Sequence, residues 1–142
     1  MQERYLFRAK RIDNGEWVEG YLSYPFCTEK GNESYYFYAK DSLGFFCRCV
    51  VDAATICQCT GLKDKNGKMI WANDIVDGHI KRGAAFLNCL VLWNECKARF
   101  DVRAVDCNFP MTLDEVVDDI SICGLDYKII GNRFDNPELL EV

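Results

Sequence analysis

The chain has 142 residues, a formal net charge of −5 and an apolar content of 49%. We predict a single domain over 1–142 that buries a sizeable core, because the length is typical of one domain and the apolar content excludes disorder. The acidic balance disfavours a protein whose main task is to grip a phosphate backbone, since such proteins are usually basic.

Neither a membrane-spanning run nor a signal peptide is apparent. The longest apolar stretch, Ala84 to Trp93, is interrupted by Asn88 and is too short to cross a bilayer. The N-terminal residues contain no apolar run of signal-peptide length. Nine cysteines without a secretory signal indicate reduced thiols. We therefore expect a cytoplasmic protein without membrane contact.

The first half of the chain alternates between apolar and polar residues, as half-buried strands do. Residues 4–12 are the first such run, and 17–24 should be its return strand. Asn14-Gly15 lies between them and predicts a two-residue hairpin, in which both positions take positive φ. Aromatic and apolar runs predict further strands at 34–40, 45–51 and 55–63.

Residues 60–76 read TGLKDKNGKMIWANDIV and raise the question of a phosphate-binding loop. Such a loop needs four residues between its first Gly and a Gly-Lys pair that Ser or Thr follows. Here five residues separate Gly61 from Gly67, and Met69 follows Lys68. A hairpin tip explains the segment better, with Asn66-Gly67 as the positive-φ pair. The nearby lysines, Lys63, Lys65 and Lys68, are then a solvated rim.

The second half predicts more strands and one helix. Thr112 and Glu115 form a capping-box pair, and the apolar residues from Leu113 to Ile120 recur at helical spacing, so a short amphipathic helix is expected there. Asn136 should cap a turn that starts at Pro137. The expected strands are 69–71, 74–80, 86–93, 98–105 and 126–130.

The fold class that follows is mainly β: an antiparallel meander or pseudobarrel with one short helix in the C-terminal third. The architecture is either a small barrel or two packed sheets. The sequence shows no internal repeat.

Three segments of the chain resemble the YopX-like family of phage and prophage proteins. They are LFRAK at 6–10, QCTGLKDKNGKMIWANDIV at 58–76 and IGNRFDNPELL at 130–140. Cys59 stands where the family usually has an aromatic residue, and Asn73 where Gly is common. The resemblance implies a predominantly β, barrel-like fold and a phage or prophage origin, but no catalytic residues. The signature residues of the middle segment are Thr60, Gly61, Leu62, Lys63, Asp64, Gly67, Trp71 and Asp74.

Two Cys-x-Cys pairs, Cys47/Cys49 and Cys57/Cys59, lie on neighbouring predicted strands and suggest a zinc site. Cysteines two apart on a strand stand about 6.5 Å apart, whereas tetrahedral zinc needs sulfurs about 3.8 Å apart. Four thiols on two strands would still be enough ligands if they converged. We favour free thiols packed in a sheet and expect no metal or other cofactor.

Basic residues on the first strand suggest a nucleic-acid contact through Arg4, Arg8 and Lys10. Leu6 interrupts this stripe, and the rings of Tyr5 and Phe7 face the other way, so they cannot stack on the same bases. Nucleic-acid binding through this strand is therefore the alternative function.

No catalytic motif is found, and the single histidine, His79, has no evident partners in the sequence. We expect a non-enzymatic module that binds a host or phage protein or associates with itself. The run from Tyr35 to Tyr38 supports this function because its rings point to both faces of one strand. One face should be core, and the other is either an interface or buried as well.

Overall fold

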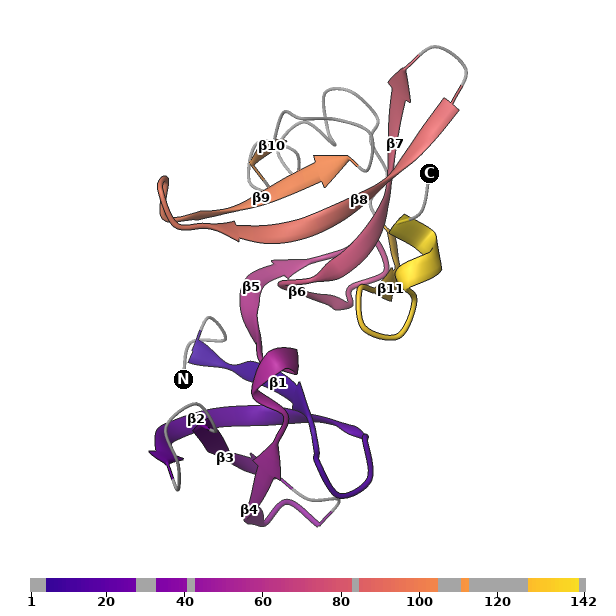
Figure 1. Ribbon diagram of the computed structural model, residues 1–142. Coiled ribbons are helices and arrows are strands. Elements are labelled where there is room, and N and C mark those ends of the chain that lie inside the picture. Colours follow the sequence, from indigo (N-terminus) through magenta and orange to yellow (C-terminus); the bar gives the residue numbers. More distant parts are fainter. Residues whose placement is uncertain are drawn as a thin grey trace. The chain divides into compact units, whose positions relative to one another are not determined.

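The computed structural model describes residues 5–27, 33–40, 43–82, 85–104, 111–112 and 128–140. The described strands pair antiparallel, which confirms the mainly β fold class. Contacts divide the chain into two compact units, Met1–Cys59 and Thr60–Val142. Figure 1 shows the strands of each unit. The single domain over 1–142 stays a prediction.

In the first unit, four strands form a meander and a fifth returns to the first. The hydrogen-bonded order is β4-β3-β2-β1-β5. A bridge between Arg11 and Val51 also joins the end of β1 to β4, so the strands close into a small barrel-like wrap. A 3-10 turn (η2, Ala53–Thr55) leads into β5. The strands are β1 (Phe7–Lys10), β2 (Trp17–Cys27), β3 (Glu33–Lys40), β4 (Phe46–Val51) and β5 (Cys57–Lys63).

The core of the first unit follows the period-two pattern of its strands. Ala9, Phe37, Cys49 and Val51 are buried together, each from the inward face of its strand. The aromatic run of β3 is split by this alternation: Phe37 is fully buried, whereas Tyr38 is 42% exposed. One face of β3 is therefore core and the other is open to solvent. Partly buried residues complete the cluster: Phe7, Val18, Leu22, Tyr35 and Ile56.

The first hairpin corrects the prediction at Asn14-Gly15. Gly15 has a φ of +71°, but Asn14 is not among the described residues with positive φ. The N–H of Arg11 donates to Glu16 O (2.9 Å) and that of Gly15 to Arg11 O (3.0 Å), which closes a four-residue loop. Such a loop needs one left-handed residue at its end.

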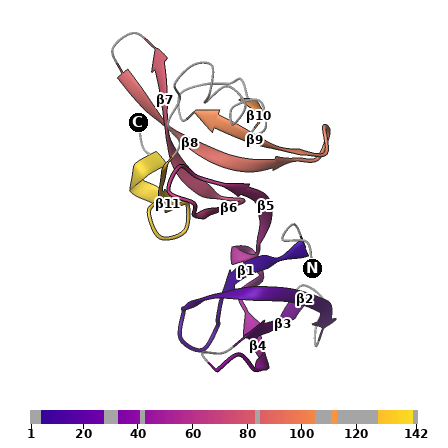
Figure 2. The same cartoon turned by 180° about the vertical axis from the view of Figure 1, so that it is seen from behind.

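The second unit repeats the strand order of the first. Its meander and returning strand give the order β10-β9-β8-β7-β11, and β5 continues into this unit to pair with β6. The long strand β8 is curved in both views (Figure 1 and Figure 2). The elements are β6 (Met69–Trp71), β7 (Asp74–Arg82), β8 (Ala85–Asn94), β9 (Arg99–Ala104), β10 (Met111–Thr112), β11 (Lys128–Asn132) and a 3-10 turn (η3, Pro137–Leu140).

The core of the second unit contains apolar residues from β6, β7, β8 and β9. The fully buried apolar residues in the core of the second unit are Ile70, Ile75, Val76, Cys89, Val91 and Val102.

The 3-10 turn starts at Pro137 as expected. The side chain of Asn136 does not cap this turn but accepts a hydrogen bond from Asn132 N (3.3 Å). The helix expected after Thr112 lies outside the described residues, and Thr112 itself ends β10.

Candidate functional site

The family-signature segment forms a tight hairpin between β5 and β6. The N–H of Asp64 donates to Lys68 O (2.8 Å) and that of Gly67 to Asp64 O (3.0 Å), so the loop has three residues. Gly67 alone supplies the positive φ (+79°), which corrects the expected Asn66-Gly67 pair. A strand follows Lys68, not a helix, so no phosphate-binding helix start is present here.

Asp64 holds this hairpin to a distant strand. Its carboxylate is buried and accepts N–H bonds from Asn66 (2.9 Å), Lys68 (2.8 Å) and Ile129 (3.1 Å). Burial raises the pKa of the Asp64 carboxyl, but the bonds from Ile129, Lys68 and Asn66 outweigh burial and hold the pKa below its usual value. The charge therefore stabilises a turn, and Lys63, Lys65 and Lys68 are exposed around it.

The other polar signature residues are also engaged with the backbone. Thr60 Oγ1 donates to Ile70 O (2.7 Å) and accepts from Leu62 N (3.1 Å), which fastens β5 to β6. Gly61 has a φ of +77°. The buried Asp74 accepts from the N–H of the buried Trp71 (2.8 Å). The structure places these residues in hairpin geometry within the second unit.

Asn73 has a backbone conformation that suits Gly, the residue that the resemblance described above leads us to expect at this position. Its φ is +69°, a left-handed conformation that Gly and Asn adopt most readily. Arg133, from the closing segment of the resemblance, donates to Asn73 through its backbone N–H (3.0 Å) and its guanidinium (3.2 Å). Two segments that the resemblance singled out thus meet in one turn.

The cysteine pairs do not lie on neighbouring strands, which corrects the sequence analysis. β4 carries Cys47 and Cys49, β5 carries Cys57 and Cys59, and β5 pairs with β1. Cys47 is exposed and the other three are buried. Burial raises the pKa of the Cys49 thiol, which disfavours the thiolate that metals bind. Within the described ranges, no group of three or more Cys, His, Asp or Glu side chains is placed to hold a metal.

The outer face of the first unit carries aromatic and basic side chains. Register fixes its members, because Arg8 pairs with Glu19, Lys10 with Trp17, Tyr21 with Tyr38, and Tyr38 with Arg48. Paired residues lie on the same side of a sheet. We call this surface the aromatic face; it comprises Leu6, Arg8, Lys10, Trp17, Glu19, Tyr21, Tyr36, Tyr38, Phe46 and Arg48.

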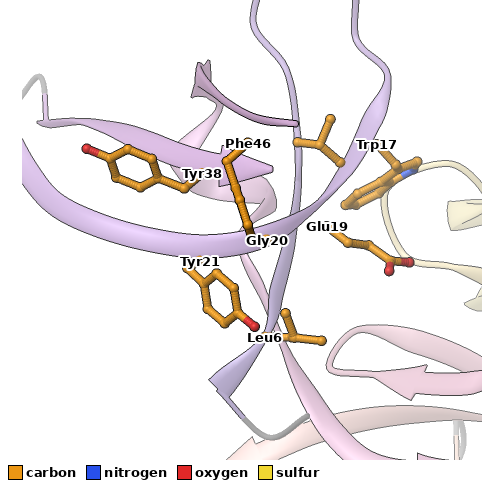
Figure 3. A pocket seen from close by; sticks show the side chains of 8 residues that line it. Leu6, Trp17, Glu19, Gly20, Tyr21, Tyr38 and Phe46 are labelled. Carbon is orange, nitrogen blue, oxygen red and sulfur yellow. The ribbon is translucent and has the colours of Figure 1, made fainter. Parts of the chain in front are cut away.

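An open hollow of about 560 Å³ lies on the aromatic face. Figure 3 shows its lining side chains gathered around β2. Phe46 is 60% exposed and Tyr38 is 42% exposed at this hollow. Gly20 lies in its floor, where an added Cβ would stand 2.1 Å from the backbone oxygen of Tyr38. The volume is within the range of small ligand pockets, which are typically about 300–1,000 Å³.

Cations of the aromatic face stand over its rings. Arg8 Cζ lies 4.8 Å and Lys10 Nζ 5.4 Å from the centre of the Trp17 ring. Arg48 Cζ lies 4.2 Å from the centre of the Tyr36 ring. Such pairs hold both partners in place, because a cation is attracted to the ring face by about 0.5–1 kcal/mol at exposed sites.

The structure brings the predicted nucleic-acid residues next to aromatic rings. Arg8 and Lys10 lie beside Trp17, and Arg4 lies outside the described residues. The rings belong to β2 and β3, whereas the sequence-based expectation concerned only Tyr5 and Phe7, on the strand of the cations itself. The predicted hairpin at 14–15 could have located Trp17, because it places 17–24 beside the first strand.

The described residues contain no helix long and apolar enough to span a membrane. His79 lies in β7, and its side chain is outside the part of the chain that the structure describes.

Comparison with known proteins places the chain in a family. The chain is similar to a protein from Enterococcus faecalis, EF1440, whose crystal structure shares 26% sequence identity with a TM-score of 0.51. That similarity covers 95% of this chain and 96% of the other. No curated protein matches. The family model described as "YopX protein" matches residues 6–141. The chain therefore belongs to the YopX family.

Proposed function

We propose that the protein is a non-enzymatic binding module and that a partner protein contacts its aromatic face. The observation that carries this proposal is the composition of that face. Trp, Tyr and Arg are the residues that dominate binding energy at protein interfaces. Here Trp17, Tyr38 and Arg48 share one sheet face with the 60% exposed ring of Phe46.

A non-catalytic role agrees with how the buried carboxylates are used. Asp64 and Asp74 accept backbone N–H bonds, and Asp101 accepts from Asn94 Nδ2 (2.7 Å) and Arg99 Nε (3.0 Å). Each holds a turn or hairpin of the second unit. Among the residues that line the hollow, the carboxylate is the exposed Glu19, and no His or Cys stands beside it.

The family resemblance sets the biological context of the proposal. The YopX-like proteins that the three segments resemble are carried by phages and prophages. We therefore assign this protein an accessory role in the cytoplasm of the host cell. Its partner is a host or phage protein, or a second copy of the same chain.

A pair of variants tests the aromatic face. Tyr38→Ala combined with Phe46→Ala removes the two most exposed rings of the hollow. Trp93→Ala is the matched control, because Trp93 is 44% exposed but lies in the second unit. Affinity capture followed by mass spectrometry should recover a specific partner with the wild type and the control. The double variant should lose it while remaining folded, with a melting temperature only several degrees below that of the wild type.

Recovery of the same partner by all three proteins would refute the aromatic face as the contact. Sedimentation of the wild type at micromolar concentration tests self-association separately. A concentration-dependent dimer that the double variant abolishes would identify the partner as a second copy.

Nucleic-acid binding is the second candidate because Arg8 and Lys10 share the aromatic face with Trp17, Tyr21 and Tyr38. Rings beside cations form the usual platform for single strands. Retention on single-stranded DNA that falls steeply with salt, and is lost in Arg8→Ala/Lys10→Ala, would favour this candidate over a protein partner.

A further inference from the structure

We propose that the aromatic face docks an extended, acidic segment of a partner protein, with an apolar side chain in the hollow and carboxylates beside the flanking cations. This inference rests on the proposed function and deepens it by naming the chemistry of the partner. Three features of the first unit support it: the sorting of charge, the position of the cations and the apolar side chains in the lining of the hollow.

Charge is unevenly sorted over the first unit. Residues 1–59 contain seven Lys/Arg and eight Asp/Glu, so the sequence of this unit is nearly neutral. Among the described side chains, however, the aromatic face holds Arg8, Lys10 and Arg48 against Glu19. The remaining described carboxylates lie in loops: Asp13 pairs with Arg11 (2.6 Å), Glu16 belongs to the first hairpin, and Asp52 caps the 3-10 turn. The face is therefore complementary to a negatively charged partner.

The cations lie on the outer strands of the face and the rings lie between them. Arg8 and Lys10 belong to β1 and Arg48 to β4, whereas β2 and β3 separate these strands. Along the sheet, through β2 and β3, three strand spacings of about 4.8 Å make the path from β1 to β4 about 14 Å. The ends of β1 and β4 also meet directly where Arg11 bridges Val51, so this path follows a curved surface. An extended segment advances about 3.4 Å per residue, so carboxylates four positions apart would reach both sides.

The middle of the same segment would lie over the hollow. Side chains two positions apart on an extended chain point the same way. An apolar residue midway between the two carboxylates therefore points into the hollow, where Leu6 and the rings of Tyr21, Tyr38 and Phe46 supply the apolar part of the lining. The docked segment should therefore contain a five-residue pattern. Its first and last residues are acidic, its central residue is apolar, and the two residues between them are unrestricted.

This arrangement suits a protein segment better than a nucleic acid. A single strand carries a phosphate at every nucleotide, and its charge would pass the exposed carboxylate of Glu19 in the lining of the hollow. A protein segment that is charged only at its two ends avoids that repulsion. The Glu19 carboxylate can accept hydrogen bonds from the backbone N–H groups in the middle of such a segment.

Selection from a ribosome-displayed library of random nonapeptides tests the proposal. We expect enrichment of peptides with two acidic residues four positions apart around an apolar residue. Arg8→Glu/Lys10→Glu should weaken binding of the enriched peptide at least tenfold. Lys63→Glu/Lys65→Glu makes the same charge change at exposed positions of the second unit and should leave the affinity within twofold. Fluorescence anisotropy gives the affinities, and thermal melting checks that each variant is folded.

Each other outcome overturns the inference in a distinguishable way. Enriched peptides that lack acidic residues, but require Tyr38 and Phe46, would refute the acidic segment and leave the proposed function intact. Failure to enrich any peptide over the Tyr38→Ala/Phe46→Ala protein would refute both. A dT15 oligonucleotide that binds tighter than every peptide, and is released by the Arg8→Glu/Lys10→Glu change, would assign the face to nucleic acid.

Discussion

The two units share a strand order but differ in what they bury. Each has a four-strand meander whose first strand also pairs with a fifth: β5 on β1, and β11 on β7. The spacing matches as well, since Phe7 pairs with Gln58 and Asp77 with Lys128, both 51 positions apart. The first unit nevertheless has an apolar core under an aromatic outer face, whereas the second also buries Asp64, Asp74 and Asp101.

This difference shows how one topology can be stabilised in two ways. In the first unit, packing around Phe37 fixes the strands, and the rings of Tyr38 and Phe46 are exposed on the outer face. In the second, the buried carboxylates of Asp64 and Asp74 accept hydrogen bonds from backbone N–H groups of turns, which would otherwise be costly to bury. We therefore expect the stability of the first unit to fall most when a buried side chain is shortened. The stability of the second should fall most when a buried hydrogen-bond acceptor is removed.

The largest effect is expected for Phe37→Ala. Removing a fully buried ring should lower the free energy of unfolding by about 3–5 kcal/mol, because it leaves a cavity. Tyr38→Ala, at the neighbouring position on the outer face, should cost less than about 1 kcal/mol. Urea unfolding monitored by circular dichroism measures both. Equal losses would contradict the division of β3 into a core face and a solvent face.

Asp64→Ala should come next, at about 2–3 kcal/mol, because three N–H groups lose their acceptor. Asp13→Ala is the matched control in the first unit, because water screens the exposed Arg11–Asp13 pair and its loss should be much milder. Amide exchange should accelerate first in β6 and β11 of the Asp64 variant. Acceleration confined to the first unit would disprove the role given to Asp64.

Gly15→Ala and Gly67→Ala should have smaller and similar effects, about 1–2 kcal/mol each. Both glycines have positive φ and open space where a Cβ would be placed, so backbone strain is the shared cause. The same urea titration compares them. A Gly67 variant that is far more harmful than the Gly15 variant would show that the signature hairpin has a requirement beyond its backbone conformation.

The smallest effect is a pH dependence from Asp64. Its folded pKa lies below the ordinary value of 3.8, so the unfolded chain binds the proton more readily. The stabilisation is therefore fully present above about pH 4 and is lost as the pH falls through the folded pKa. Asp64→Asn should be less stable than the wild type at neutral pH, and the difference should shrink on acidification. A difference that stays constant from pH 6 to pH 2.5 would contradict this assignment.

Local features of the fold were predictable from the sequence, and distant ones were not. Alternation located the strands to within a few residues, because it reports which side chains are half-buried. Loop length was wrong at Asn14-Gly15 and Asn66-Gly67, since the dipeptide marks a turn without fixing which residues pair across it. The bond from Ile129 to Asp64, 65 positions away, depends on strand order, which local patterns do not report.

The candidate site was half predictable for the same reason. Arg8 and Lys10 were identified on one face, and one face of β3 was expected to be open. The pairing of Lys10 with Trp17 and of Tyr21 with Tyr38 joins these two observations into one surface. Recognising this surface from the sequence would require the pairing register of three strands. A hairpin loop that is longer than predicted shifts the register by whole residues, so the register was not predictable.

The returning strands have a consequence for the order of events during synthesis. The strands assigned to the first unit, β1 to β5, have all emerged from the ribosome once Lys63 has, whereas β7 must wait for its partner strand Lys128–Asn132. Because domains acquire structure as their sequence becomes available, the N-terminal barrel should form while the ribosome is still translating the second half. The surface that we assign to a partner would then be complete before the protein itself is.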